Sequence, residues 1–280
     1  MTTLDLHQAA SAQRTIWNEL VGAAWVRHAG LHDRQAESFG AAAMAAIGTV
    51  AGATVLDVGC GTGATSIALA GRGAREVAGV DISAPMINAA QAGNRCPEVT
   101  FTHGDVLALS RPGHFDVIFS RFGVMFFADP SAAFTHLRTL GSPAARLGFC
   151  CWGPPAENPW MLLPVMATVP VLGPPQLAAS GEPGPFSLSS PEVIADVLAR
   201  GGWTDVAIEP LTINQPHPAG DAAAVSRVVV EFSPPIAQGL RQQPERIDDV
   251  LGAIAEALRP LERDGIVHLQ ASAFVVTAHA

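Results

Sequence analysis

The segment TVLDVGCGTGATSIALA at residues 54–70 decides the fold, because it joins a short apolar strand to a glycine-rich turn and then to a helix. A nearly continuous apolar run such as 54–58 is typical of a parallel strand that is covered on both faces. Gly59, Gly61 and Gly63 then permit positive φ angles and let a ligand approach the backbone. Apolar residues at helical spacing resume at Ile67. The segment therefore predicts a ligand site at the carboxyl end of the strand.

The glycines alone leave the cofactor open. Gly59, Gly61 and Ala64 also match the dinucleotide pattern G-x-G-x-x-G/A, so an NAD(P)-dependent oxidoreductase is one alternative. A third glycine, an acid two residues before the turn and a second acid, Asp81, 22 residues after Gly59 favour S-adenosylmethionine (SAM) instead. A carboxylate at the end of the second strand can accept hydrogen bonds from both ribose hydroxyls of an adenosine cofactor.

Four motifs in order carry a resemblance to a known family: LDVGCGTG, GVDIS, HGDVL and FDVIFSRFGVMFFADP. Together they resemble the class I SAM-dependent methyltransferases, within the ubiquinone/menaquinone-methyltransferase-like branch that acts mostly on small molecules. The resemblance covers residues 31–211. It implies SAM as the cofactor, S-adenosylhomocysteine as the product, and a Rossmann-like sheet of seven strands with the last strand antiparallel.

The resemblance also implies which residues meet the cofactor. The residues before and within the turn would line the methionine portion, those after the second strand would hold the ribose, and those after the third would flank the adenine. The full set of expected cofactor residues is Asp57, Gly59, Cys60, Gly61, Gly63, Asp81, Ile82, Gly104, Asp105, Val106 and Ser120.

Alternating strands and helices predict one α/β domain over residues 1–280 with a doubly wound, mostly parallel sheet. We expect N-terminal cap helices over 1–50, with helices at 12–28 and 34–50, and a SAM-binding core over 51–153. A proline-rich apolar lid is expected over 154–189. Residues 190–280 would complete the sheet, with a helical insertion inside 212–244 and a helix over 246–263.

Composition excludes several kinds of chemistry. The net charge is −9, and a chain with no Lys- or Arg-rich run is poorly suited to nucleic acid. All 16 basic residues are arginine and tyrosine is absent, which excludes Schiff-base, pyridoxal-phosphate, P-loop and phenolic-base mechanisms. The low charge content, 15%, hints at self-association, so a homodimer is possible.

The four cysteines form no C-x-x-C pair, and we expect them to be reduced thiols. The first thirty residues lack a signal-peptide pattern, and no apolar run reaches membrane-spanning length. We therefore expect a cytoplasmic protein.

Candidate acceptor residues come from three places: the N-terminal helix, the end of the fourth strand and the lid. They are Trp17, Trp25, Arg121, Phe122, Met125, Trp152, Asn158 and Trp160. Each has a structural alternative, because large apolar residues usually pack in a core and Arg121 could pair with an acid such as Asp57 or Asp116. Tryptophans and an apolar lid suggest a flat or hydrophobic small molecule.

His28 and His32 are four residues apart, so a metal site is conceivable, but Gly30 between them interrupts the turn and we expect no metal. His32 is the candidate catalytic base for an acceptor that must lose a proton, with a solvated loop histidine as the alternative. Methyl transfer itself is an in-line displacement that needs alignment and exclusion of water.

The sequence thus predicts an enzyme that transfers a methyl group from SAM to an O, N or C nucleophile of a small molecule. A SAM-binding protein without methyl transfer is a further alternative.

Overall fold

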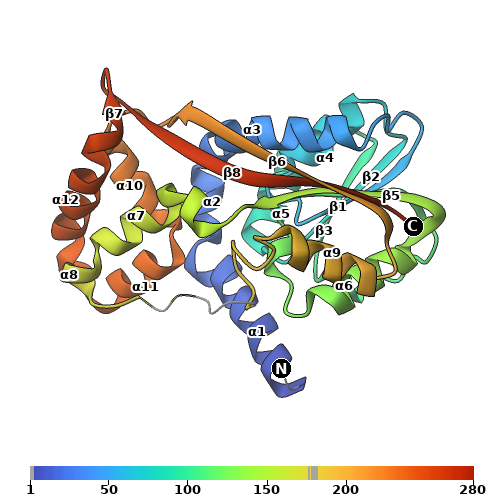
Figure 1. The fold of residues 1–280 in the computed structure, drawn as a ribbon, viewed down its shortest axis with the longest axis horizontal. Coiled ribbons are helices and arrows are strands. Elements are labelled where there is room, and N and C mark those ends of the chain that lie inside the picture. The colour runs from blue at the N-terminus through green and yellow to red at the C-terminus, as the bar shows by residue number, and fades with distance from the viewer. Residues whose placement is uncertain (1–2, 176, 178–181) are drawn as a thin grey trace.

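The computed structural model describes residues 3–175, 177 and 182–280, and it is built around one twisted sheet (Figure 1). Seven strands follow one another in the order β3-β2-β1-β4-β5-β8-β6. Five run parallel to one another: β1 (Thr54–Val58), β2 (Glu76–Asp81), β3 (Val99–His103), β4 (Phe115–Arg121) and β5 (Gly141–Trp152). The long strand β8 (Ile266–His279) is antiparallel to both of its neighbours, β5 and β6 (Thr204–Pro216), so β6 runs in the same direction as the first five strands. The short β7 (Glu262–Arg263) pairs with the start of β8. The predicted doubly wound, mostly parallel sheet is confirmed.

Helices cover both faces of this sheet. On one face α3 (Ala29–Ala46), α4 (Ala64–Gly71) and α5 (Ala84–Gly93) share a buried cluster with β1 and β2. On the other face α6 (Pro130–Leu140) and α9 (Pro191–Arg200) share a second cluster with β4 and β5. The strand order reverses between β1 and β4, and this switch point is where doubly wound sheets bind ligands.

Three helices begin with a side-chain cap. Asp129 Oδ1 accepts a hydrogen bond from Ala132 N at 3.0 Å, at the start of α6. Ser83 and Ser190 do the same for α5 and α9, and each of the three caps has a proline in the following first turn. A side-chain oxygen here satisfies a backbone N–H that has no partner within the helix.

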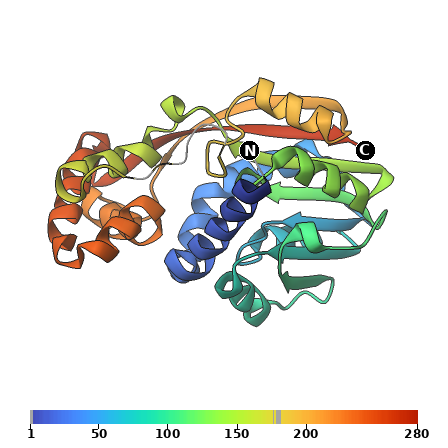
Figure 2. The same ribbon diagram turned by 90° about the horizontal axis from the view of Figure 1, so that it is seen from below.

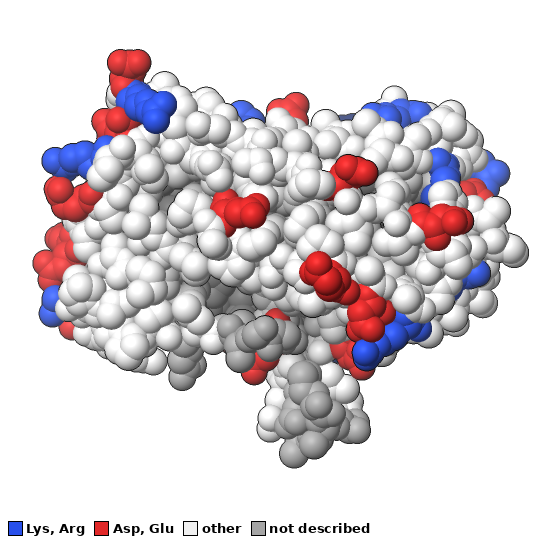
Figure 3. Space-filling model, in the orientation of Figure 1, with Lys and Arg blue, Asp and Glu red and all other residues white. Residues whose placement is uncertain are grey.

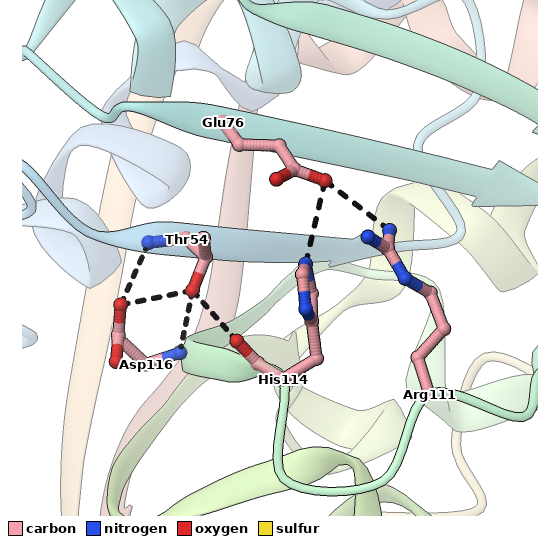
Figure 4. A network of polar contacts seen from close by, with 5 residues as sticks. All are labelled: Thr54, Glu76, Arg111, His114 and Asp116. Carbon is pink, nitrogen blue, oxygen red and sulfur yellow. Dashed lines mark hydrogen bonds and ion pairs between the residues drawn. The ribbon is translucent and has the colours of Figure 1, made fainter.

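A polar network fixes the amino ends of β1, β2 and β4, at the edge opposite the glycine turn (Figure 4). Thr54 N donates to Asp116 Oδ2 at 2.9 Å, and Thr54 Oγ1 lies 2.8 Å from the same atom. Beside it, Glu76 Oε1 lies 3.2 Å from Arg111 Nη1 and 3.4 Å from His114 Nε2. The backbone N–H of Thr54 lowers the pKa of Asp116, so this carboxylate is charged and holds two strands in register.

The N-terminal segment differs from the single helix expected over residues 12–28. It consists of α1 (Thr3–Thr15), a π-helical turn η1 (Ile16–Leu20) and α2 (Gly22–Arg27). The carbonyl of Trp17 is drawn out of the helix, where it accepts a hydrogen bond from Ser83 Oγ at 2.8 Å. The next helix begins at Ala29 instead of residue 34, so Gly30 lies inside α3 and does not interrupt it.

Five helices form a separate body at one end of the sheet, which we call the helical lobe: α7 (Pro159–Ala167), α8 (Val169–Leu172), α10 (Ala222–Phe232), α11 (Pro234–Gln242) and α12 (Ile247–Leu258). It has its own buried cluster, and β6 and β8 extend from the sheet to reach it (Figures 1 and 2). The segment expected to be a lid supplies α7 and α8 to this lobe, while residues 176 and 178–181 of that segment lie outside the described residues. The 212–244 region contributes the end of β6 together with α10 and α11, and α12 ends before residue 263 because a 3₁₀ turn follows.

Short 3₁₀ helices occupy several loops: η2 (Val106–Ala108), η3 (Val124–Phe126), η4 (Pro155–Glu157), η5 (Pro244–Arg246) and η6 (Arg259–Leu261). The face in Figure 3 carries scattered acidic and basic side chains separated by broad uncharged areas. That pattern agrees with the low content of charged residues.

Candidate cofactor and acceptor site

A cavity of about 860 Å³ begins at the carboxyl ends of β1 to β4 and extends to the helical lobe. Most of the predicted cofactor residues line it: Gly59, Cys60, Gly61, Asp81, Ile82, Gly104, Asp105 and Val106. They come together because parallel strands end at the same edge of a sheet.

The glycine turn has the geometry that the sequence predicts. Gly59, Gly61 and Gly63 have φ angles of 68°, 56° and 91°, in the left-handed region that favours glycine. A Cβ atom on Gly63 would lie 2.4 Å from the Phe101 ring, and one on Gly59 would lie 2.8 Å from the Cα of Gly123. The turn is therefore tightly packed from behind while its front faces the cavity.

Asp81 is held in place by backbone groups. Its two carboxylate oxygens accept hydrogen bonds from Gly61 N and Ser83 N, each at 2.8 Å. Burial raises the pKa of Asp81, and these two N–H groups oppose the rise. The side chain is thereby fixed between the glycine turn and α5, with lone pairs left to accept hydrogen bonds from a ligand.

Asp57, Gly63 and Ser120 do not line the cavity. Asp57 is fully buried, and its Oδ2 accepts a hydrogen bond from Ser66 Oγ at 2.6 Å. Burial raises the pKa of Asp57 to about 6. Ser120 Oγ donates to Val58 O at 2.7 Å, so these residues support the turn from behind.

The N-terminal helices add residues that the sequence did not indicate. Arg14 Nη1 lies 3.2 Å from Asp105 Oδ2. Asn18 Nδ2 donates to Ile82 O at 2.9 Å, and Asn18 Oδ1 accepts from Ala84 N at 2.8 Å. These contacts join residues far apart in the chain, and no local pattern marks them.

Aromatic side chains surround the other end of the cavity. Trp25 stacks on His32 with ring centroids 4.0 Å apart, and Trp17 lies edge-on to Trp25 at 5.4 Å. Phe122 stacks on Trp152 at 3.8 Å. Of the predicted acceptor residues, those that line this cavity are Trp17, Trp25, Arg121, Phe122, Met125, Trp152 and Trp160. We call this part the acceptor end.

Asn158 is the predicted acceptor residue that does not line the cavity. It is fully buried, donates to Ser272 O at 2.9 Å and accepts from Ser272 N at 3.0 Å. The indole N–H of Trp160 donates to its Oδ1 at 3.2 Å. Asn158 therefore anchors the loop after β5.

Phe122 has an unusual backbone, with φ at 62°. A non-glycine residue in this region carries strain that the surrounding packing must offset. Its ring is held by the stack on Trp152 and by the edge of Phe39 at 5.7 Å. This conformation turns the chain directly after β4 and presents the ring to the cavity.

His32 lies in an environment that keeps it uncharged. Burial lowers its pKa to about 3, and the neighbouring His28 acts in the same direction. Its Nε2 atom has no hydrogen-bond partner among the described residues. A neutral imidazole offers one donor and one acceptor nitrogen, so His32 can exchange a hydrogen bond with a bound ligand.

Arg121 forms an ion pair with Asp33, Nη2 to Oδ1 at 2.5 Å. The partners suggested from the sequence, Asp57 and Asp116, were wrong, because the arginine side chain runs along α3 past Gly40 and reaches Asp33 in its second turn. Within the described parts of the chain, no group of three or more His, Cys, Asp or Glu side chains could hold a metal ion. None of the described helices is both long enough and apolar enough to cross a membrane.

Comparison with known proteins agrees with this geometry. A family model described as a methyltransferase domain matches residues 55–143. The chain is 32% identical over 169 residues to nocamycin O-methyltransferase of Saccharothrix syringae, a match that covers 55% of this chain and 60% of that enzyme. It is 27% identical over 180 residues to demethylmenaquinone methyltransferase of Beutenbergia cavernae, covering 61% of this chain and 74% of that one. The chain thus spans less than two thirds of the first of these relatives.

A solved structure of phosphoethanolamine N-methyltransferase 2 of Haemonchus contortus, in complex with SAM, has a similar fold. Its TM-score is 0.51 at 17% identity, over 86% of this chain and 52% of that one. The strand order and this similarity define the Rossmann-like methyltransferase fold. Residues 55–143 match a methyltransferase domain, and the chain is similar to SAM-dependent methyltransferases over a larger part of its length.

Proposed function

We propose that this protein transfers the methyl group of SAM to an uncharged, flat and largely apolar small molecule. The observation that carries the proposal is the single cavity that joins the glycine turn to the acceptor end. Its volume of about 860 Å³ lies near the top of the range of roughly 300–1,000 Å³ for small-molecule sites, which suits a cofactor and an acceptor together.

The character of the acceptor end supports an uncharged acceptor. His32 is neutral, and Arg121 is paired with Asp33. The remaining predicted acceptor residues on this wall are aromatic rings and Met125. Because the charges of Arg121 and Asp33 offset each other, a charged acceptor would lose hydration without meeting a net opposite charge on this wall, and its binding would be disfavoured.

The chain's own residues would align the reactants and exclude water. SAM, when bound, supplies a methyl group activated by positive sulfur. The faces of Trp17 and Trp25 can stabilise a nearby cation and support a flat ring. His32 is proposed to accept a hydrogen bond from an acceptor hydroxyl and to take up its proton where the acceptor must lose one.

We also propose a cellular location and an oligomeric state. We propose a cytoplasmic location, supported by the four cysteines, which are all free thiols. A homodimer is proposed only on the low content of charged side chains.

The test has two stages. Calorimetric titration with SAM, S-adenosylhomocysteine and NADH is expected to show binding of the two adenosyl ligands, lost in Asp81→Ala. Formation of S-adenosylhomocysteine is then measured with flat phenols and quinols and, for comparison, with charged aliphatic amines. We expect turnover with the flat compounds and a lower rate in Trp25→Ala.

Each of three results would contradict the proposal. Binding of NADH without binding of SAM would make the turn a dinucleotide site. Turnover of the charged amines in preference to the flat compounds would contradict the acceptor class, and binding of SAM without turnover of any compound would favour a SAM-binding protein that does not transfer methyl groups.

A further inference from the structure

We propose that Arg121 and Asp33 together bind the amino-acid end of the cofactor, Arg121 through its α-carboxylate and Asp33 through its α-ammonium group. The inference rests on SAM as the cofactor and is independent of the acceptor proposed above. It gives the ion pair a binding role in place of the acceptor contact expected from the sequence.

The position of Arg121 along the sheet supports this assignment. It is the last residue of β4, which pairs with β1, the strand that precedes the glycine turn. Asp81 and Asp105 follow β2 and β3, on the other side of β1. If those two residues mark the adenosine end, as the family resemblance implies, the methionine end lies towards β4 and Arg121.

The pair has unused hydrogen-bonding capacity. Among the described residues, only Nη2 of the Arg121 guanidinium has a partner, and only Oδ1 of Asp33. The two side chains are 19% and 31% exposed, and both line the cavity. A guanidinium presents further N–H donors in a fork that matches a carboxylate, and the free carboxylate oxygen can accept from an ammonium group.

The other cavity-lining aspartates are already engaged. Asp81 accepts hydrogen bonds from Gly61 N and Ser83 N. Asp105 accepts from Leu107 N and pairs with Arg14. Asp57, the acid before the glycine turn, does not line the cavity, so Asp33 is the aspartate best placed to meet an ammonium group at this end.

The fold also makes room for the arginine. Gly40 lies on α3 beside its aliphatic stem, and a Cβ atom there would come within 2.9 Å of Arg121 Cδ. The glycine lets the stem lie flat against the helix, so the guanidinium can reach both Asp33 and the cavity. A charged group placed this way is oriented before any ligand arrives, which reduces the ordering cost of binding.

The test compares two ligands that differ only at the proposed contact. S-Adenosylhomocysteine carries the amino-acid end, whereas 5′-methylthioadenosine has the same adenosine and thioether without it. For Arg121→Met we expect calorimetric affinity for S-adenosylhomocysteine to fall about 10- to 100-fold, as for loss of a charge-assisted hydrogen bond, with affinity for 5′-methylthioadenosine unchanged. Asp33→Asn, which keeps the shape of the side chain, should show the same discrimination.

Two control variants define the meaning of the result. Asp81→Ala should weaken both ligands alike, because both contain the ribose. Arg14→Met removes the other Arg–Asp pair of the cavity and should not discriminate between the two ligands. Thermal unfolding without ligand establishes that each variant is folded.

Three results would overturn the proposal. Equal weakening of both ligands in Arg121→Met and Asp33→Asn would make the pair a purely structural link between β4 and α3. Unchanged affinity for both ligands would place the pair outside the cofactor site. Discrimination by Arg14→Met of the same size would move the amino-acid end to the other pair.

Discussion

At the scale of single residues, the side chains that titrate abnormally act on stability in opposite directions. His32 has a pKa lowered to about 3 and His217 one lowered to about 4, in both cases chiefly by burial. Asp57 has a pKa raised to about 6 by burial. The histidines lose stability as the pH falls, whereas the buried acid gains it, so the pH profile of the protein is a balance between them.

His32 provides a direct test of that balance. Between pH 6.5 and 3 the unfolded chain binds a proton at this site that the folded protein does not, so the free energy of unfolding decreases as the pH falls through this window. In His32→Gln this contribution is absent, and we expect a smaller loss of stability from pH 7 to pH 5. Urea unfolding at the two pH values measures the difference.

The matched control is His7→Gln, which changes an exposed histidine on α1. It should reproduce the wild-type dependence on pH. An equally steep loss of stability in His32→Gln would mean that burial does not lower the pKa of His32, so that its imidazole would be protonated at pH 5 in the folded protein as in the unfolded chain.

At the scale of elements, the N-terminal segment is shaped by one distant hydrogen bond. Ser83 Oγ draws the carbonyl of Trp17 out of the helix, and Gly22 leaves the space that this carbonyl enters. π-helical turns inside helices often mark functional sites, and here the turn places Trp17 at the cavity.

Gly22→Ala is expected to disturb this turn. Its Cβ atom would lie 2.0 Å from Trp17 O, so the backbone must shift. Overpacking of this kind costs about 1–3 kcal/mol of the free energy of unfolding. We also expect weaker binding of S-adenosylhomocysteine, because Asn18 in the same turn holds Ile82 and Ala84.

Gly30→Ala serves as the comparison. Gly30 is exposed within α3, and the nearest atom to an added Cβ is Arg34 Nη1 at 3.6 Å. Because glycine is a poor helix former, alanine there should stabilise the protein by about 0.5–1 kcal/mol. Urea unfolding and ligand titration of both variants test the prediction, and a neutral Gly22→Ala would show that the turn relaxes freely.

The elements also show where sequence reasoning succeeds. The strand at 54–58 was predicted to the residue, because its buried apolar run ends directly before the first glycine of the turn. The break at Ile16–Leu20 was missed because its cause, Ser83, lies more than sixty residues away. In the same way, the glycine turn and Asp81 were visible from spacing, whereas Asp33 and Arg14 enter the cavity only through contacts made after folding.

At the scale of the whole molecule, the protein consists of a sheet body that carries the proposed cofactor residues and a helical lobe that lines the other end of the cavity. The lobe provides Trp160, Val165 and Phe232 to the cavity wall. Its cluster of buried residues is separate from the two clusters on the sheet. A substitution that destabilises the lobe should therefore weaken binding of the acceptor more than binding of the cofactor.

Ile254→Ala tests this division. Ile254 is fully buried in the lobe, and its truncation should cost about 2–5 kcal/mol. We expect faster amide exchange in α10 and α12 than in α4, and weaker binding of an acceptor with little change in affinity for S-adenosylhomocysteine. Exchange measured by mass spectrometry, together with calorimetry, gives both results.

Ile194→Ala is the matched change, because Ile194 is equally buried but lies in α9 against the sheet. Ile194→Ala should make amide exchange faster in the sheet body and leave exchange in the lobe unchanged. Uniform loss of protection throughout the chain in both variants would show that sheet and lobe unfold as one unit.

The lobe is assembled from two stretches of chain, Pro159–Leu172 and Ala222–Leu258, with α9 and β6 of the sheet body between them. The lobe therefore cannot be deleted or replaced by changing one continuous segment of the chain. An engineer who wished to give this enzyme another acceptor could not exchange the lobe as a cassette. The practical route would be to substitute individual wall residues, such as Trp160 and Phe232, while leaving the two interleaved stretches intact.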